Sequence, residues 1–219
     1  YAVFRIDPSR GSAVLREVLG DAFGGALGCE YFSAYRKFMR ECDIRVQFCL
    51  AHLIRDLKFL VTLGGATAAY GEQMLDAMRE LFHIIHRQDK MGRNAFRNAL
   101  FDQRRAIVAL AIRGAPDTPH SRSMADRFEK HGDAYFRFIT TPGLGPTNNL
   151  AEQAIRFVVI DRRITQGTRG ERGRQWCERI WTVMATCAMQ GRSAYEYIVE
   201  AVDAHLQGRP APSLLPSNP

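Results

Sequence analysis

The sequence contains few cysteines, and their spacing excludes two common kinds of cross-linked domain. There are five, an odd number, and no two of them form a Cys-x-x-Cys pair. A disulfide framework needs paired cysteines, and a zinc ribbon needs two such close pairs. We therefore expect reduced thiols. Cys49 and His52 lie three residues apart, as metal ligands can, but no second pair follows, and a buried cysteine beside a helix histidine is the favoured interpretation.

Long apolar runs are also missing. No stretch approaches the ~20 apolar residues that span a bilayer, and no secretory leader opens the chain. These absences predict a soluble, intracellular protein. The chain also lacks an initiator methionine and opens with Tyr1, which favours a fragment of a longer protein.

The charge, by contrast, is strongly biased. The 219 residues include 30 Lys plus Arg and 23 Asp plus Glu, a net charge of +7, and most of the basic residues are arginines. Arginine suits bidentate contacts with phosphate, so a polyanionic partner is plausible, although basic composition alone is weak evidence. The 46% hydrophobic content suffices for a core in one large domain, or in one domain with an insertion.

The first third of the chain alternates between strand and helix patterns. Strands are predicted at residues 1–6, 26–29 and 44–48. Helices are predicted after a cap at Ser9, at residues 33–41 and at residues 50–63, the last with Leu53, Leu57 and Leu60 facing inward. This alternation predicts an α/β layer with partly parallel strands, where sites gather at the carboxyl ends of strands. Glu30 follows such a strand.

The pattern then changes to helices alone. From residue 71 to about residue 138 the apolar residues recur at helical spacing, which indicates a helical insertion. A glycine-proline turn follows, and prolines after Gly208 predict a loose tail.

The most informative stretch is Thr147-Asn148-Asn149-Leu150-Ala151-Glu152-Gln153-Ala154-Ile155-Arg156. Asn149 can cap a helix there, with Glu152 and Arg156 on one side. An apolar stripe is expected on the other side, made of Leu150, Ala151, Ala154, Ile155, Val158 and Val159. Glu152 equally completes a capping box with Asn149 and an ion pair with Arg156, so a purely structural role stays open.

Three separated segments resemble the IS66 family of bacterial transposases. The Thr-Asn-Asn-Leu-Ala-Glu segment is the most specific and is followed by Val-Ile-Asp-Arg-Arg and Gln-Gly-Thr-Arg-Gly. The run from Glu30 through Ser33-Ala34-Tyr35 is similar to the family's second-acid motif, and Cys49-x-x-His52-x-x-Arg55 is similar to the stretch after its fifth strand. The resemblance covers nearly the whole chain.

This resemblance implies an α/β fold with a ribonuclease H-like core, incomplete at its N-terminus and interrupted by an all-helical insertion. Residues 1–64 and 143–208 would belong to the core, residues 65–142 to the insertion and residues 209–219 to the tail. The family's Asp, Asp, Glu triad binds Mg²⁺ or Mn²⁺ for DNA cleavage and strand transfer at transposon ends. Glu30 matches the second acid, where the family usually has Asp, and Glu152 matches the third. The first aspartate has no counterpart.

The resemblance also implies DNA as the partner, with a homo-oligomer forming on it, and a cytoplasmic location in a bacterium with nucleoid association when DNA is bound. Candidate DNA contacts around the acidic helix are Asn148, Asn149, Arg156, Arg162, Arg163, Arg169 and Arg172. Trp176 and Trp181 could stack on bases, but their helical spacing favours core positions. A second basic cluster lies in the insertion and either tracks DNA or is a solvated helix face: Arg87, Lys90, Arg93, Arg97, Arg104 and Arg105.

Two rival functions remain open. A non-catalytic DNA-binding remnant of a transposase would keep the basic surface without the reaction. A helical interaction domain without a nucleic-acid role would make the basic bias incidental. Strong salt dependence of DNA binding would separate the remnant from the interaction domain.

Overall fold

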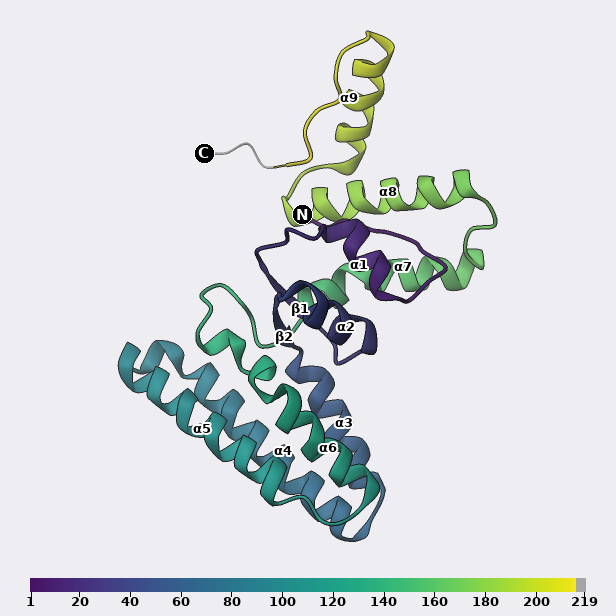
Figure 1. The fold of residues 1–219 in the computed structure, drawn as a ribbon. Coiled ribbons are helices and arrows are strands. Elements are labelled where there is room, and N and C mark those ends of the chain that lie inside the picture. The colour runs from purple at the N-terminus through teal and green to yellow at the C-terminus, as the bar shows by residue number, and fades with distance from the viewer. Residues whose placement is uncertain (216–219) are drawn as a thin grey trace. The chain divides into compact units, whose positions relative to one another are not determined.

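The computed structural model describes residues 1–215, which are mostly helical and carry a two-stranded parallel sheet (Figure 1). The chain divides into two compact units. The larger is Arg10–Asn148, and the smaller combines Tyr1–Ser9 with Asn149–Pro219. The sequence-based boundaries at residues 64 and 142 stay predictions.

The larger unit opens with the expected strand and helix alternation. Its first elements are α1 (Ser12–Leu19), β1 (Ala26–Cys29), α2 (Ser33–Cys42), β2 (Arg45–Phe48) and α3 (Leu50–Thr62). The strands run parallel, with Ala26 opposite Arg45 and Cys29 opposite Phe48. The predicted strands at 26–29 and 44–48 are thus confirmed. The predicted cap at Ser9 is wrong: α1 has Gly11 at its N-cap, and the Ser9 N–H donates to Asp7 Oδ1 at 2.8 Å in a local turn.

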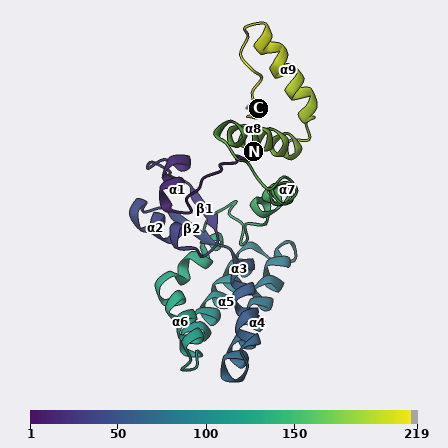
Figure 2. The same ribbon diagram turned by 90° about the vertical axis from the view of Figure 1, so that its right-hand side faces the viewer.

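The predicted helical segment is confirmed as a stack of long helices. After α3 come α4 (Gly65–His86), α5 (Arg93–Arg113) and α6 (Pro119–His131), and consecutive helices pack side by side (Figure 1 and Figure 2). The larger unit also contains three short 3₁₀ helices. The first, η1 (Gln88–Lys90), lies between α4 and α5, and η2 (Gly132–Tyr135) and η3 (Arg137–Ile139) follow α6.

The α3–α4 contact is close because of a glycine. Leu53, Leu57 and Leu60 of α3 are buried as predicted. A Cβ added at Gly71 of α4 would lie 3.1 Å from Leu60 Cβ and from the backbone nitrogen of Val61, so a larger residue would push the two helices apart.

A buried glutamine joins the sheet to the end of the helical stack. The Gln47 side chain of β2 donates to the carbonyl of Tyr135 at 2.8 Å and accepts from the N–H of Phe138 at 2.9 Å. Both polar ends of the amide are therefore satisfied, as burial demands. The hydrophobic core of this unit extends from the sheet into the helices.

As far as it is described, the smaller unit contains three helices and an extended segment. The helices are α7 (Asn149–Thr165), α8 (Glu171–Met189) and α9 (Ala194–Leu206). The predicted strand at residues 1–6 is wrong. Instead, the N–H groups of Ala2, Phe4 and Ile6 donate to side chains of α8 at Thr186, Thr182 and Glu178, over 3.2, 3.1 and 2.7 Å.

This docking has a simple geometric cause. Alternate residues of an extended chain are about 6.6 Å apart, and residues four apart on a helix are separated by about 6 Å along its axis. Three acceptors at four-residue spacing on α8 can therefore bind every second N–H of the segment. The ring of Phe4 meets those of Phe157 and Trp181, with centroids 5.7 and 6.2 Å away.

The end of the chain forms no helix as far as it is described. Across residues 209–215 the carbonyls of Pro212 and Leu214 accept hydrogen bonds from Tyr197 and Gln190 at 3.0 and 2.7 Å. The rest of the expected tail, residues 216–219, lies outside the described residues. Within the described part of the chain, every helix is too short or too polar to cross a bilayer.

Candidate active site

Glu30 lies where the sequence places it, directly after the carboxyl end of β1. Its side chain is 44% exposed, so solvent reaches the carboxylate. One carboxylate oxygen is 3.5 Å from Nε2 of His52, on the first turn of α3. Glu30 therefore presents an accessible carboxylate beside the imidazole of His52.

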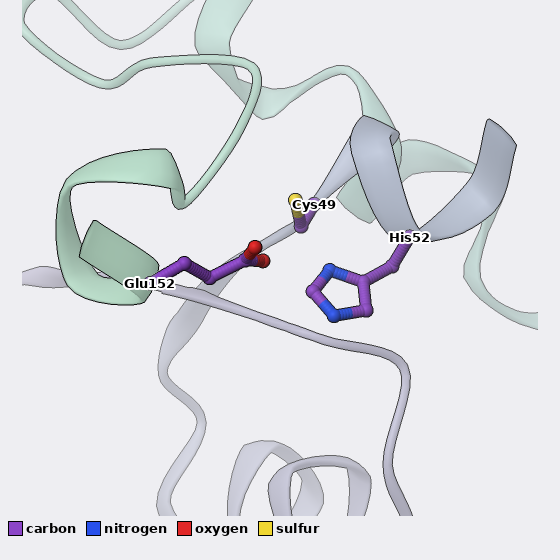
Figure 3. A group of neighbouring side chains, drawn as sticks. All are labelled: Cys49, His52 and Glu152. Carbon is purple, nitrogen blue, oxygen red and sulfur yellow. The ribbon is translucent and has the colours of Figure 1, made fainter. Parts of the chain in front are cut away.

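Cys49 and His52 mark the start of α3 and are drawn in Figure 3, which also labels Glu152 of the smaller unit. Cys49 is buried, and its N–H donates to the carbonyl of Cys29 at 2.8 Å, which extends the pairing of the two strands. Burial raises the pKa of the neighbouring Cys29 thiol to about 12, so that thiol stays protonated at neutral pH. The expectation of a buried Cys49 is confirmed.

The loop before α7 is attached to the same point. The N–H of Asn148 donates to Cys49 Sγ at 3.4 Å, and the N–H of Leu50 donates to the carbonyl of Pro146 at 3.0 Å. These bonds hold the Thr147-Asn148 part of the signature against the end of β2. Among the described residues, the buried Oδ1 of Asn148 has no hydrogen-bond partner, which leaves an acceptor available to a ligand.

Glu152 lies in the first turn of α7, which begins at Asn149 itself. Its half-buried carboxylate is favoured there, because the positive end of the helix dipole stabilises a negative charge. Arg156, one turn later, is exposed. Glu30 belongs to the larger unit and Glu152 to the smaller. Their convergence on one metal site stays a prediction.

The predicted apolar stripe of α7 is partly wrong. Leu150 is 78% exposed, and Ile155 and Val159 are also exposed. The inward positions are Ala154, Phe157 and Val158, all half-buried. Both sets have helical spacing, so periodicity alone does not choose between them, and the contact of Phe157 with Phe4 decides which face turns inward.

The arginines around α7 are available to a polyanion. Five are exposed, and none forms an ion pair within the described part of the chain: Arg156, Arg162, Arg163, Arg169 and Arg172. Arg174, in contrast, pairs with Glu171 at 2.5 Å and with Glu178 at 2.9 Å. Gln166 and Gly167, with φ of 58° and 81°, turn the chain between the helices.

The start of α8 adds backbone donors to these arginines. Its N-cap is Gly170, and no side chain caps the first turn. Free N–H groups and the helix dipole at such an end favour an anion. Asn149 is exposed at the start of α7 and is also accessible to a ligand.

The two tryptophans differ from each other. Trp181 is 8% exposed and packs with Phe4, as expected for a core residue. Trp176 is 64% exposed, so its predicted core position is wrong. It lies five residues earlier on α8 and therefore on another face of the helix.

The sequence did not predict the contact between Glu30 and His52. The only signal for it was that each follows a neighbouring strand, because residues after parallel strands share one edge of the sheet. Sequence reasoning also missed the contacts of the buried Arg127, which bonds to the half-exposed Asp56 at 2.6 Å and lies over the ring of Tyr31 at 4.0 Å. No pattern links those three segments in the sequence.

The chain is similar to a known family and to a protein of a known organism. The model of the family described as "Transposase IS66 family" matches residues 1–175. The uncharacterized protein y4qI of Sinorhizobium fredii (strain NBRC 101917 / NGR234) is 27% identical over 227 residues, an alignment that covers 95% of this chain and 41% of that protein. The chain thus spans about two-fifths of the length of this relative. No solved structure matches.

Proposed function

Because this chain belongs to the IS66 transposase family, we propose that it is part of the catalytic domain of a DNA transposase that cleaves phosphodiesters and transfers strands at transposon ends. The observation that carries this proposal is the extent of the family match, residues 1–175, which includes both candidate acids and the Thr-Asn-Asn-Leu-Ala-Glu segment. The parallel β1-α2-β2 unit with Glu30 at its edge supports a ribonuclease H-like core, with residues 65–142 inserted into it.

Mg²⁺ or Mn²⁺ is the cofactor of this proposal, and the donors present suit it. Carboxylates are the hard oxygen ligands that these ions prefer, and Glu30 is open to solvent. Glu30 and Glu152 would hold the metal, together with the first aspartate of the family's triad, which has no counterpart in these 219 residues. When bound, two such ions activate the attacking oxygen and stabilise the leaving oxygen of a phosphodiester.

The other residues of the site bind and orient the DNA. The guanidinium groups of Arg156, Arg162, Arg163, Arg169 and Arg172 would contact backbone phosphates, which position a strand without reading its sequence. Asn148 and Asn149 would orient the strand at the start of α7. His52 lies 3.5 Å from Glu30 and positions that carboxylate. DNA is then the partner, a homo-oligomer assembles on it, and the protein acts in the cytoplasm on nucleoid DNA.

The alternative is a non-catalytic DNA-binding remnant. It is favoured by the glutamate at position 30, where the family usually has aspartate. The longer side chain moves the carboxylate by about one carbon–carbon bond, and a misplacement of about 1 Å can cost ~100-fold in rate.

One experiment separates the two functions. A longer protein that contains this chain together with the family's first aspartate is incubated with Mn²⁺ and supercoiled plasmid, and strand cleavage is compared for wild type, Glu30→Gln and Glu152→Gln. An amide keeps the shape of the side chain but loses the charge that holds the cation, so we expect each variant to lose more than about 100-fold in rate. Glu80→Gln, an exposed glutamate on α4, is the matched control and should cleave like wild type.

Salt-dependent DNA binding without any Mn²⁺-dependent cleavage would support the remnant. Cleavage that survives both substitutions would refute the assigned acids.

A further inference from the structure

A groove of about 1010 Å³ lies in the larger unit, away from Glu30, between the first half of α5 and the segment that follows η3. Its lining includes Gln88, Arg93, Asn94, Arg97, Phe101 and Phe138. A volume of this size lies at the upper end of the roughly 300–1,000 Å³ of small-molecule pockets, so the groove has room for an extended ligand.

The charged side chains of the groove are mainly positive. Arg93 and Arg97 are exposed, lie one turn apart on α5, and form no ion pair within the described part of the chain. Asp89 is the one acidic residue in the lining. Farther along the same helix, Arg104 is bonded to Asp133 at 2.6 Å. The basic cluster of the insertion therefore contains free cations at the groove and neutralised ones beyond it.

Phe101 continues the line of these two arginines. It follows Arg97 by four residues, so Arg93, Arg97 and Phe101 share one face of α5. Phe96 and Phe138 pack against the hydrophobic core and form the floor of the groove. Phe101 is half-buried and lies outside that core cluster. Its ring is thus in the groove without being needed to fill the core.

Guanidinium groups in line with an aromatic ring suit a single nucleic-acid strand. Phosphates bind the cations, and a base stacks on the ring regardless of its identity. In a duplex the bases are stacked on one another and present no face to Phe101. The uncapped first turn of α5, with Gly92 at its N-cap, adds backbone N–H groups at the end where Arg93 lies.

We propose that this groove binds an unpaired segment of a DNA strand, with phosphates on Arg93 and Arg97 and a base on Phe101. The inference rests on the proposed transposase function and deepens it, since it assigns the helical insertion a contact with single-stranded DNA. It does not depend on the metal-binding acids.

The test is equilibrium binding of a fluorescein-labelled 12-mer of thymidine, and of a 12-base-pair duplex, to the whole chain at several NaCl concentrations. Each phosphate contact with a single strand contributes a slope of about 0.7 in a plot of log affinity against log salt. We expect Arg93→Gln with Arg97→Gln to lower the slope for the 12-mer by about 1.4. The matched control is Arg79→Gln with Arg122→Gln, two exposed arginines outside the groove that are ion-paired to Asp76 and Asp117.

The ring is tested by two substitutions of similar volume. Phe101→Leu keeps an apolar side chain but removes the stacking face, and we expect about a tenfold loss of affinity for the 12-mer with an unchanged salt slope. Phe101→Tyr keeps the ring and should bind like wild type. Thermal unfolding of each variant confirms that the helix stack is intact.

The outcomes are distinct. Equal losses for the 12-mer and the duplex, or a control variant that loses as much slope as the groove variant, would overturn the proposal. Absence of binding between the wild-type chain and the 12-mer would also overturn the proposal. Groove variants that bind the 12-mer like wild type, while the longer protein with the first aspartate shows Mn²⁺-dependent cleavage, would refute the groove alone. Absence of cleavage by that longer protein, with groove binding intact, would refute the transposase chemistry alone.

Discussion

At the scale of single residues, His131 shows how neighbouring groups shift the pKa of a side chain. Its ring lies against those of Tyr31 and Phe48, with centroids 5.7 and 6.1 Å away. Burial, and then the positive charges of Arg36, Arg40, Lys130 and Arg127, lower the pKa of His131 below its usual 6.5. The imidazole is therefore held neutral in the folded protein, while it titrates normally in the unfolded chain.

We predict a loss of stability as the pH falls below 6.5. Between 6.5 and the lower folded pKa, the unfolded chain binds a proton that the folded protein does not. The free energy of unfolding therefore falls as the pH falls through this range. Above pH 6.5 the contribution of His131 to stability is complete. His131→Gln should flatten this dependence in urea titrations from pH 5 to 8. His83→Gln, an exposed histidine on α4, should leave it unchanged. An equally steep curve for His131→Gln would contradict the assignment.

At the scale of elements, the segment from Tyr1 to Ile6 shows a side-chain ladder in place of strand pairing. Its β-branched and aromatic residues predict a strand, and its backbone is extended, but its alternate N–H groups bond to α8. The hydrogen-bond acceptors of this segment therefore belong to a helix and not to a neighbouring strand. Local propensity determines the extended conformation, whereas the partner depends on what lies nearby.

We predict that Thr182→Val loosens this segment. Valine has the shape of threonine without the hydroxyl, which accepts from the Phe4 N–H and donates to the Glu178 carbonyl within α8. The lost bond to Phe4 is worth about 1 kcal/mol. Hydrogen exchange at the Phe4 amide should accelerate by about three- to tenfold. The Ile6 amide, bonded to Glu178, serves as the internal control and should change less. Unchanged protection of Phe4 would show that the ladder does not hold the segment.

Element by element, short-range patterns predicted much of the larger unit. The leucines of α3 and the apolar runs of β1 and β2 carry their own periodicity, so these elements could be found without the structure. On α7 the same method chose Leu150 and Ile155 over Phe157, because a helix with apolar residues all round has no unique inward face.

At the scale of the whole molecule, only some of the basic side chains behind the net charge of +7 are available to bind a polyanion. Several arginines are already bonded to acids, among them Arg16, Arg104, Arg122 and Arg174. The exposed arginines of α7 and of the loop that follows are not. Salt dependence of DNA binding should therefore track a small subset of the cations and not the total.

We predict that Arg163→Gln lowers the salt slope for a duplex by about 0.9, the contribution of one phosphate contact. Arg209→Gln is the matched control, since that arginine is bonded to Asp203 at 2.9 Å and should leave the slope unchanged. Binding isotherms from low to high NaCl measure both. Equal slopes for wild type and Arg163→Gln would remove this arginine from the DNA interface.

The sequence by itself determined the family, the charge and the elements with their own periodicity. Motifs such as Thr-Asn-Asn-Leu-Ala-Glu and the leucine repeat of α3 are local, so neighbours along the chain suffice to identify them. The tertiary structure alone decided that His52 meets Glu30, that Arg93 and Arg97 line a groove, and that residues 1–6 bond to a helix. Each of these outcomes depends on residues distant in sequence, whose encounter is set by packing and not by local preference.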